Sequence, residues 1–153
     1  MPIKLYLDQN YLSGFAKSKP AFAELLPVVR AAVARGAVEV FESTVHERES
    51  SPRPDLELLA LLRSLTGGRR LPGPPDPELR RRMVWTIEHE LPERAPRPSD
   101  AADLDALACA IAYCDLVTCD AFMADVLRRM RVRTELFTGR RADVMRLRQQ
   151  LLT

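Results

Sequence analysis

The sequence predicts an α/β fold in which a parallel sheet is covered by helices on both faces. Short apolar segments that fit buried strands alternate along the chain with longer segments whose apolar residues recur at helical spacing. Strands that are apolar at nearly every position are typical of parallel sheets, which have no face in water. The chain of 153 residues has the size of one ordinary domain. We therefore expect residues 1–153 to form a single domain, a three-layer α/β/α sandwich with a central parallel sheet.

The first half of the chain supplies two strand-and-helix pairs. An apolar strand is expected over residues 3–7, and the first helix is expected over residues 21–35. Five apolar residues of this helix recur every three or four positions: Phe22, Leu25, Leu26, Val29 and Val33. A second buried strand is expected over residues 37–41, and Ser43 or Thr44 can cap the helix that follows it. The order β-α-β-α is therefore present before the middle of the chain.

The second half continues the alternation after a loop that is rich in glycine and proline. Asp76, which precedes a proline, is a typical helix start, and Ser99 or Asp100 can cap a later helix. In the helix that begins after Asp76, both Met83 and Trp85 are expected to face the core. The expected elements are helices over 55–65, 77–91, 100–114 and 119–130, strands over 116–118 and 134–138, and a last helix from residue 142.

The composition is typical of a globular protein outside the membrane. Hydrophobic residues make up 46% of the chain and charged residues 29%, and no apolar run approaches the roughly 18 residues of a membrane span. The amino terminus lacks the features of a signal peptide, so the expected location is the cytoplasm, without membrane contact. The three cysteines are an odd number and fit reduced thiols in such a compartment. The formal charge of +2 is too small to indicate nucleic-acid binding by itself.

Acidic residues fall where the expected strands end and where the expected helices begin. Asp8 follows the first strand, and Asp120 follows a later strand with one residue between them. Glu47 and Glu49 begin the helix after the second strand. The carboxyl ends of parallel strands meet at one edge of a sheet, and ligands bind at that edge in open α/β folds. These acids are therefore expected to lie near one another.

A further helix start carries three acids, of which Asp100 is more readily explained as a cap. Asp103 and Asp105 flank the buried stripe of this helix on opposite sides, so periodicity does not decide which of them faces the sheet edge. The same choice arises for Glu47 and Glu49, which are roughly 200° apart around a helix and cannot both face one site. The spacing slightly favours Glu49, and both remain candidates.

Carboxylates gathered at one edge repel one another unless a cation lies among them. Oxygen ligands without His or Cys suit Mg²⁺ or Mn²⁺. Such an ion makes a water ligand more acidic, and that water can attack a phosphodiester while the ion neutralises the developing charge. The pattern therefore predicts a Mg²⁺ or Mn²⁺ site formed by Asp8, Asp120, one of Glu47 and Glu49, and one of Asp103 and Asp105.

Two stretches of the chain resemble the PIN-domain nucleases. YLDQNYL is similar to the opening strand and acid of that family. DLDALACAIAYCDLVTCDAF is similar to its closing half, where an Asp opens a helix of small apolar residues and a strand ending in T-x-D follows. STVHERE lies between them and supplies the intermediate acid. The resemblance implies a PIN-like fold with a catalytic acidic quartet: Asp8, Glu49 or Glu47, Asp105 with Asp103 as its alternate, and Asp120.

The resemblance also implies a function, the Mg²⁺- or Mn²⁺-dependent hydrolysis of RNA. Homodimers are frequent in the family, and many small bacterial members are toxins silenced by an antitoxin protein. This chain departs from the pattern in two ways, which fit a divergent PIN-like group and count against the toxin role more than against the fold. Gln9 stands where Thr is commoner, and the proline-rich middle, residues 51–99, has no counterpart in the shortest toxins.

Two other classes of protein also place carboxylates at strand ends. Phosphotransfer proteins of the haloacid-dehalogenase or receiver type need a late lysine, and no lysine follows Lys19. The remaining alternative is a catalytically inactive PIN-like module that binds RNA or a protein. The presence of acids in all four segments favours the enzyme over this module.

Overall fold

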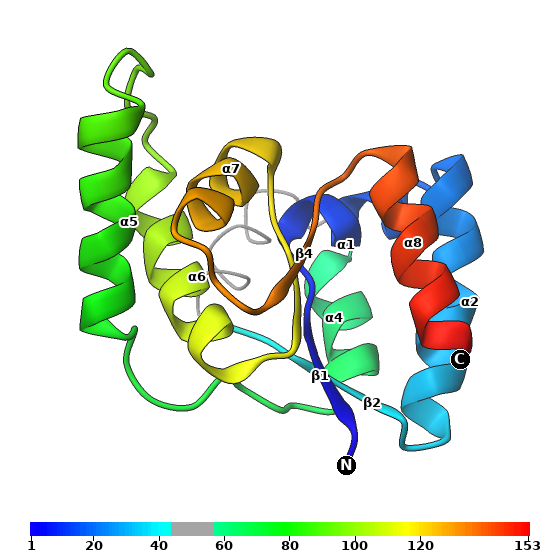
Figure 1. Ribbon diagram of the computed structural model, residues 1–153. Coiled ribbons are helices and arrows are strands. Elements are labelled where there is room, and N and C mark those ends of the chain that lie inside the picture. The colour runs from blue at the N-terminus through cyan, green and yellow to red at the C-terminus, as the bar shows by residue number, and fades with distance from the viewer. Residues whose placement is uncertain (44–56) are drawn as a thin grey trace.

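The computed structural model describes residues 1–43 and 57–153 of the chain (Figure 1). The candidate acids Glu47 and Glu49 therefore lie outside the described residues. The described elements are β1 (Ile3–Tyr6), α1 (Gln9–Ala16), α2 (Pro20–Ala34), β2 (Val38–Phe41), α4 (Leu58–Thr66), α5 (Pro77–Glu90), α6 (Asp100–Tyr113), β3 (Leu116–Thr118), α7 (Ala121–Arg129), β4 (Glu135–Phe137) and α8 (Arg141–Leu152).

The described strands form one sheet of four strands in the order β2-β1-β3-β4, and every pair is parallel. Tyr6 of β1 is in register with Phe41 of β2 on one side and with Val117 of β3 on the other. Because all four strands run in the same direction, their carboxyl ends lie at one edge of the sheet. The expected α/β class with a parallel sheet is confirmed.

Helices cover both faces of this sheet, as Figure 1 shows. Leu5 and Leu116 point into a core shared with α1, α2, α4 and α8. Their neighbours Tyr6 and Val117 point to the opposite face, into a core shared with α5, α6 and α7. This alternation follows from the two-residue period of a strand. The arrangement is compatible with the expected three layers.

The first helix of the structure, α1, is not among the expected elements. It contains Gly14, a poor helix former. The reason for a glycine is close packing, because a Cβ atom at this position would lie only 2.6 Å from the ring of Phe22. Phe22 in turn packs edge-on against Tyr11, with ring centroids 5.0 Å apart. The sequence signal for α1 is weak because tertiary packing overrides local propensity there.

On α5 the expectation for Met83 is confirmed, because its side chain is fully buried, but the expectation for Trp85 is wrong. The side chain of Trp85 is 53% exposed and stacks on the ring of His89. Two residues along a helix are about 200° apart, so Met83 and Trp85 cannot both face the core.

Two further expectations concern the environment of the chain. The cysteines Cys109, Cys114 and Cys119 are free thiols, as expected. Across residues 1–43 and 57–153, no helix has the length and apolar character that a membrane crossing requires.

Candidate functional site

A pocket of ≈ 290 Å³ opens at the carboxyl edge of the sheet, where α1, α6 and α7 begin. Three carboxylates line it, and they come from parts of the chain that are far apart in sequence: Asp8, Asp103 and Asp120. Asn10, Ser99 and Thr118 add polar groups to the same wall. Asp8 and Asp120 therefore lie at the carboxyl edge of the sheet, as the sequence predicts, and α6 adds a third acid.

Asp8 is held by contacts to β3 and to its own helix. Its backbone N–H donates to Thr118 Oγ1 at 2.7 Å, and that hydroxyl donates to Asp8 Oδ1 at 2.8 Å. The same Oδ1 caps α1 by accepting from the N–H of Tyr11 at 3.3 Å. Among the described residues, no hydrogen bond engages the other oxygen, Oδ2, which is left for a ligand.

Asp120 has the same arrangement at the start of α7. Its Oδ1 accepts from the N–H of Met123 at 2.7 Å and caps the helix. Two neighbouring parallel strands, β1 and β3, are thus each followed by an Asp, at the second position after the strand, that caps the next helix. Because each cap uses only one carboxylate oxygen, each Asp serves a structural role and keeps an oxygen for binding.

Asp103 lies in the first turn of α6, half-buried in the pocket wall. Its carboxylate makes no hydrogen bond and no ion pair with the part of the chain that the structure describes. Asp100, one turn earlier, is by contrast engaged through Oδ2, which accepts from the guanidinium of Arg94 at 2.6 Å and from the N–H of Arg97 at 2.9 Å. Asp103 is therefore the least constrained acid of the three in the pocket.

The surroundings make two of the pocket acids unusually hard to ionise. Burial raises the pKa of Asp8 to about 6, and the charge of Asp120 adds to this, against the hydrogen bonds from Thr118 and Tyr11. Burial also raises the pKa of Asp103 to about 6, and the charges of Asp120, Asp100 and Asp8 add to it. Mutual repulsion of this kind requires the three acids to be close, and a bound cation would relieve it.

Arg94 contacts the first turns of both α6 and α7, the helices at whose starts Asp103 and Asp120 lie. It pairs with Asp100 at the start of α6, and its guanidinium lies 3.8 Å from the ring centroid of Phe122 in the first turn of α7. Burial alone would raise the pKa of Asp100, but the hydrogen bonds from Arg94 and from the N–H of Arg97 keep it below its ordinary value. Arg94 lies in a proline-rich connector without periodicity, so no sequence signal marks it.

Asp105 is not part of this pocket. Its carboxylate accepts a hydrogen bond from Arg80 Nε at 2.7 Å, on the side of α6 that faces α5. Of the pair that the sequence leaves open, the structure therefore brings Asp103 to Asp8 and Asp120, and we revise the preference for Asp105 accordingly. Glu47 and Glu49, which fall outside the described residues, are not placed.

A further buried acid, Glu42, follows β2 but does not reach the pocket. Its side chain is 2% exposed, accepts from Thr66 Oγ1 at 2.9 Å, and lies 3.6 Å from Arg70 and 3.8 Å from Arg63. The two arginines offset the negative charge of Glu42, and backbone hydrogen bonds join the end of β2 to the chain after α4. Glu42 is a structural acid.

Two described side chains beside the pocket that could act as a nucleophile or a base, Cys119 and Tyr11, are not activated. Burial, together with the charges of Asp8 and Asp120, raises the pKa of the Cys119 thiol far above its ordinary value. Burial likewise raises the pKa of the Tyr11 phenol, which donates to the carbonyl oxygen of Thr138 at 2.7 Å. Both groups stay protonated at neutral pH, so the carboxylates remain the chemical groups of the site.

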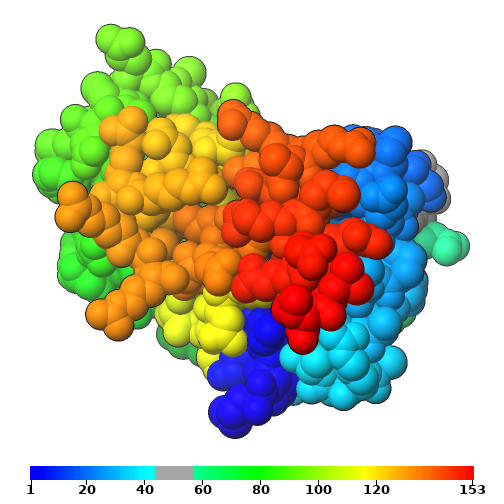
Figure 2. Space-filling model, turned by 45° about the vertical axis from the view of Figure 1, so that its right-hand side comes forward, coloured from blue at the N-terminus to red at the C-terminus, as the bar shows by residue number. Residues whose placement is uncertain are grey.

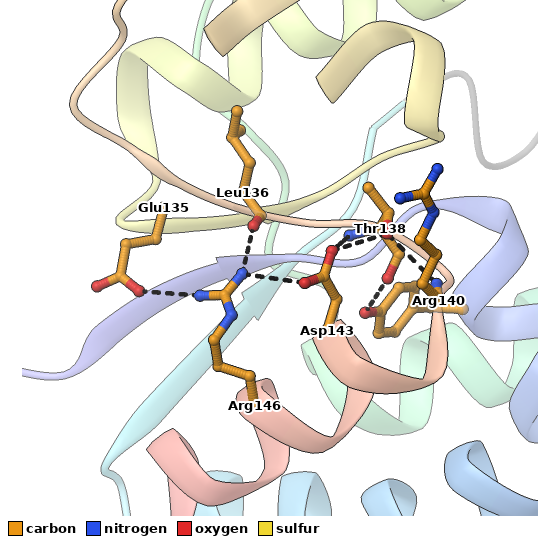
Figure 3. A network of polar contacts seen from close by, with 7 residues as sticks. Glu135, Leu136, Thr138, Arg140, Asp143 and Arg146 are labelled. Carbon is orange, nitrogen blue, oxygen red and sulfur yellow. Dashed lines mark hydrogen bonds and ion pairs between the residues drawn. The ribbon is translucent and has the colours of Figure 1, made fainter. Parts of the chain in front are cut away.

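The end of β4 is fixed by a polar network that Figure 3 shows. Asp143 accepts from both the N–H and the hydroxyl of Thr138, at 2.8 and 2.7 Å. Arg146 donates to the carbonyl oxygen of Leu136 at 2.8 Å and lies 3.6 Å from Glu135. Although burial alone would raise the pKa of Asp143, these hydrogen bonds and Arg146 hold it below its ordinary value. The network locks the start of α8 beside the sheet edge that carries the pocket.

The residues of the pocket fit a hard divalent cation by donor type, since they offer carboxylate oxygens and no thiolate or imidazole. In the described part of the chain, however, no three His, Cys, Asp or Glu side chains are gathered tightly enough to chelate a metal ion as they stand. Mg²⁺ commonly keeps several waters and is bound through one or two carboxylates.

Comparisons of the chain with models of protein families, with curated proteins and with solved structures find no match.

Proposed function

We propose that this protein is a PIN-like, Mg²⁺- or Mn²⁺-dependent ribonuclease. One observation carries the proposal: Asp8, Asp103 and Asp120 come from three separate elements and line one pocket at the carboxyl edge of a parallel sheet. Two of them have a pKa raised to about 6, mainly by burial and in part by the negative charge of their neighbours. Unsatisfied repulsion among carboxylates in a pocket is typical of sites that bind a cation for function.

The cation would be held by Asp8, Asp103 and Asp120. When bound, it would supply an acidified water and neutralise the charge that develops on a phosphodiester. The protein orients the carboxylates. The capping hydrogen bonds of α1 and α7 hold one oxygen of Asp8 and one oxygen of Asp120, and so fix the direction of the other oxygen of each. Arg94 maintains the spacing of α6 and α7 around the pocket.

The first test is cleavage of a labelled single-stranded RNA by the purified protein. We expect cleavage with Mn²⁺ or Mg²⁺, none with EDTA, and a loss of about 100-fold or more for Asp8→Asn. Asn keeps an oxygen that can cap α1, so this variant should remain folded. Its circular dichroism spectrum and melting temperature provide the control. Cleavage that survives EDTA, or an Asp8→Asn variant as active as the parent protein, would eliminate the metal mechanism.

A second candidate function is a PIN-like module that binds RNA or a protein and does not cut. The loose arrangement of the acids, which do not form a chelating group among the described residues, favours this alternative. The two functions differ in one result. A binding module retains its ligand in EDTA and never yields shortened RNA, whatever divalent ion is added.

A further inference from the structure

Beside the acidic pocket lies a second hollow, of ≈ 560 Å³, between α7 and the start of α8. Ala121 and Phe122 line this hollow, while Asp120 and Met123 line the pocket, so the two share the first turn of α7. Figure 2 shows α7 and α8 next to each other at the surface on the side of the molecule that it faces. The pocket and the hollow therefore lie on different sides of α7 and meet at its amino end.

Two exposed arginines, Arg128 and Arg140, line the hollow. Arg128 shares one face of α7 with Ala121, because residues seven apart on a helix lie on the same side. It lies eight residues after Asp120, which corresponds to about 12 Å along the helix. Arg140 stands directly before α8, and Figure 3 shows its guanidinium directed away from Asp143.

The positive charges of these two arginines are not neutralised. The hollow contains two acids, but Asp125 is paired with Arg129 at 3.1 Å, and Asp143 is engaged by Thr138 and Arg146. Among the residues that the structure describes, neither Arg128 nor Arg140 forms an ion pair or a side-chain hydrogen bond. The hollow therefore offers two cations that pair with no described carboxylate, next to a pocket that carries net negative charge.

The position of Arg140 has no evident structural benefit. It caps the amino terminus of α8, where the helix dipole disfavours a cation, and its side chain makes no capping hydrogen bond. Two arginines of α5 show the opposite behaviour, since Arg80 pairs with Asp105 and Arg81 with Glu78, while a third, Arg82, donates to the carbonyl oxygen of Met130. The exposed face of α5 is therefore largely self-neutralised, and the hollow between α7 and α8 is not.

We infer that the hollow between α7 and α8 holds the phosphate backbone of a single-stranded RNA next to the bond that is cut, with Arg128 and Arg140 as its phosphate-binding residues. This inference rests on the proposed function. A strand with its scissile phosphate at Asp120 carries further phosphates on both sides, and the acidic pocket repels them. The planar guanidinium groups offer paired donors that match phosphate oxygens.

The test measures binding of a fluorescein-labelled single-stranded RNA by fluorescence anisotropy in EDTA, over a series of salt concentrations. Arg128→Gln/Arg140→Gln is compared with Arg131→Gln/Arg133→Gln, which removes the same charge from the loop that leads into the amino end of β4. We expect the first double variant to bind roughly tenfold more weakly. The slope of log affinity against log salt should fall by about 1.4, which is the loss of two phosphate contacts on a single strand. The second double variant should bind like the parent protein.

Cleavage with Mn²⁺ in parallel separates this inference from the proposed function. If the parent protein cuts RNA and Arg128→Gln/Arg140→Gln keeps the parental affinity and salt slope, the inference is overturned and the nuclease stands. The hollow would then suit an acidic segment of a protein partner. If the parent protein binds RNA through these arginines but never cuts it, the inference stands and the nuclease is overturned. If the parent protein does not bind RNA, both are overturned.

Discussion

Asp103→Asn is expected to reduce RNA cleavage by about 100-fold or more, whereas Asp105→Asn, two residues away on the same helix, should stay within about twofold of the parent protein. Asp103 lines the pocket with Asp8 and Asp120. Asp105 pairs with Arg80 instead. The two substitutions are chemically identical, so a difference between them reports on the position of the carboxylate.

The stability of these two variants should change in opposite directions in metal-free buffer. Asp103→Asn removes a charge that burial disfavours and that the neighbouring acids repel, and should raise the melting temperature. Asp105→Asn loses an ion pair whose side chains are 37% and 44% exposed, so its melting temperature should fall by no more than a few degrees. Loss of activity in Asp105→Asn with full activity in Asp103→Asn would overturn our assignment of the pocket acids.

Stability without metal is expected to fall as the pH rises from about 4 to about 7. The pKa values of Asp8 and Asp103 are raised from 3.8 to about 6 in the folded protein. Between these values the folded state binds more protons than the unfolded state, so each rise in pH favours unfolding, and the loss is complete above the folded-state pKa. Two pKa units correspond to about 3 kcal/mol for a buried group such as Asp8, and the half-buried Asp103 adds a smaller share, so the free energy of unfolding should fall by at least about 3 kcal/mol, or several degrees in melting temperature.

Added Mn²⁺ should restore this stability at neutral pH and have little effect at acid pH, where the carboxylates are protonated. At a concentration one hundred times its dissociation constant, a ligand of the folded state stabilises by about 2.7 kcal/mol. Differential scanning calorimetry over the pH series, with EDTA and with Mn²⁺, measures both effects. Asp8→Asn/Asp103→Asn provides the control, and its profile should be flatter over the same range. A parent protein with the same profile as this double variant would show that burial and mutual repulsion do not raise the pKa of Asp8 and Asp103.

The sheet edge and two of the pocket acids are predictable from the sequence, for a physical reason. A buried strand such as residues 3–7 is recognisable by its apolar run, and the residue after a parallel strand has only one edge of the sheet to occupy. The sequence pattern therefore identifies Asp8 and Asp120 as residues of this edge without any information on tertiary contacts. Both are helix caps as well, so the same feature also has a purely local explanation.

The choice between Asp103 and Asp105 is not predictable in this way. Six residues of α6 between positions 104 and 111 are buried, and they leave no single polar face to serve as a reference. Only the position of α5, whose Arg80 captures Asp105, separates the two acids. For Trp85, by contrast, the helical period alone is sufficient, since it places this residue opposite the buried Met83.

Crystals grown with Mn²⁺ provide the most direct test that this pocket binds a catalytic cation. We expect the anomalous difference map at the manganese absorption edge to show a peak bounded by Asp8, Asp103 and Asp120, and the Asp103→Asn crystal to show a weakened peak or none. A pocket without a peak, at a Mn²⁺ concentration that supports cleavage in solution, would contradict our account of the site.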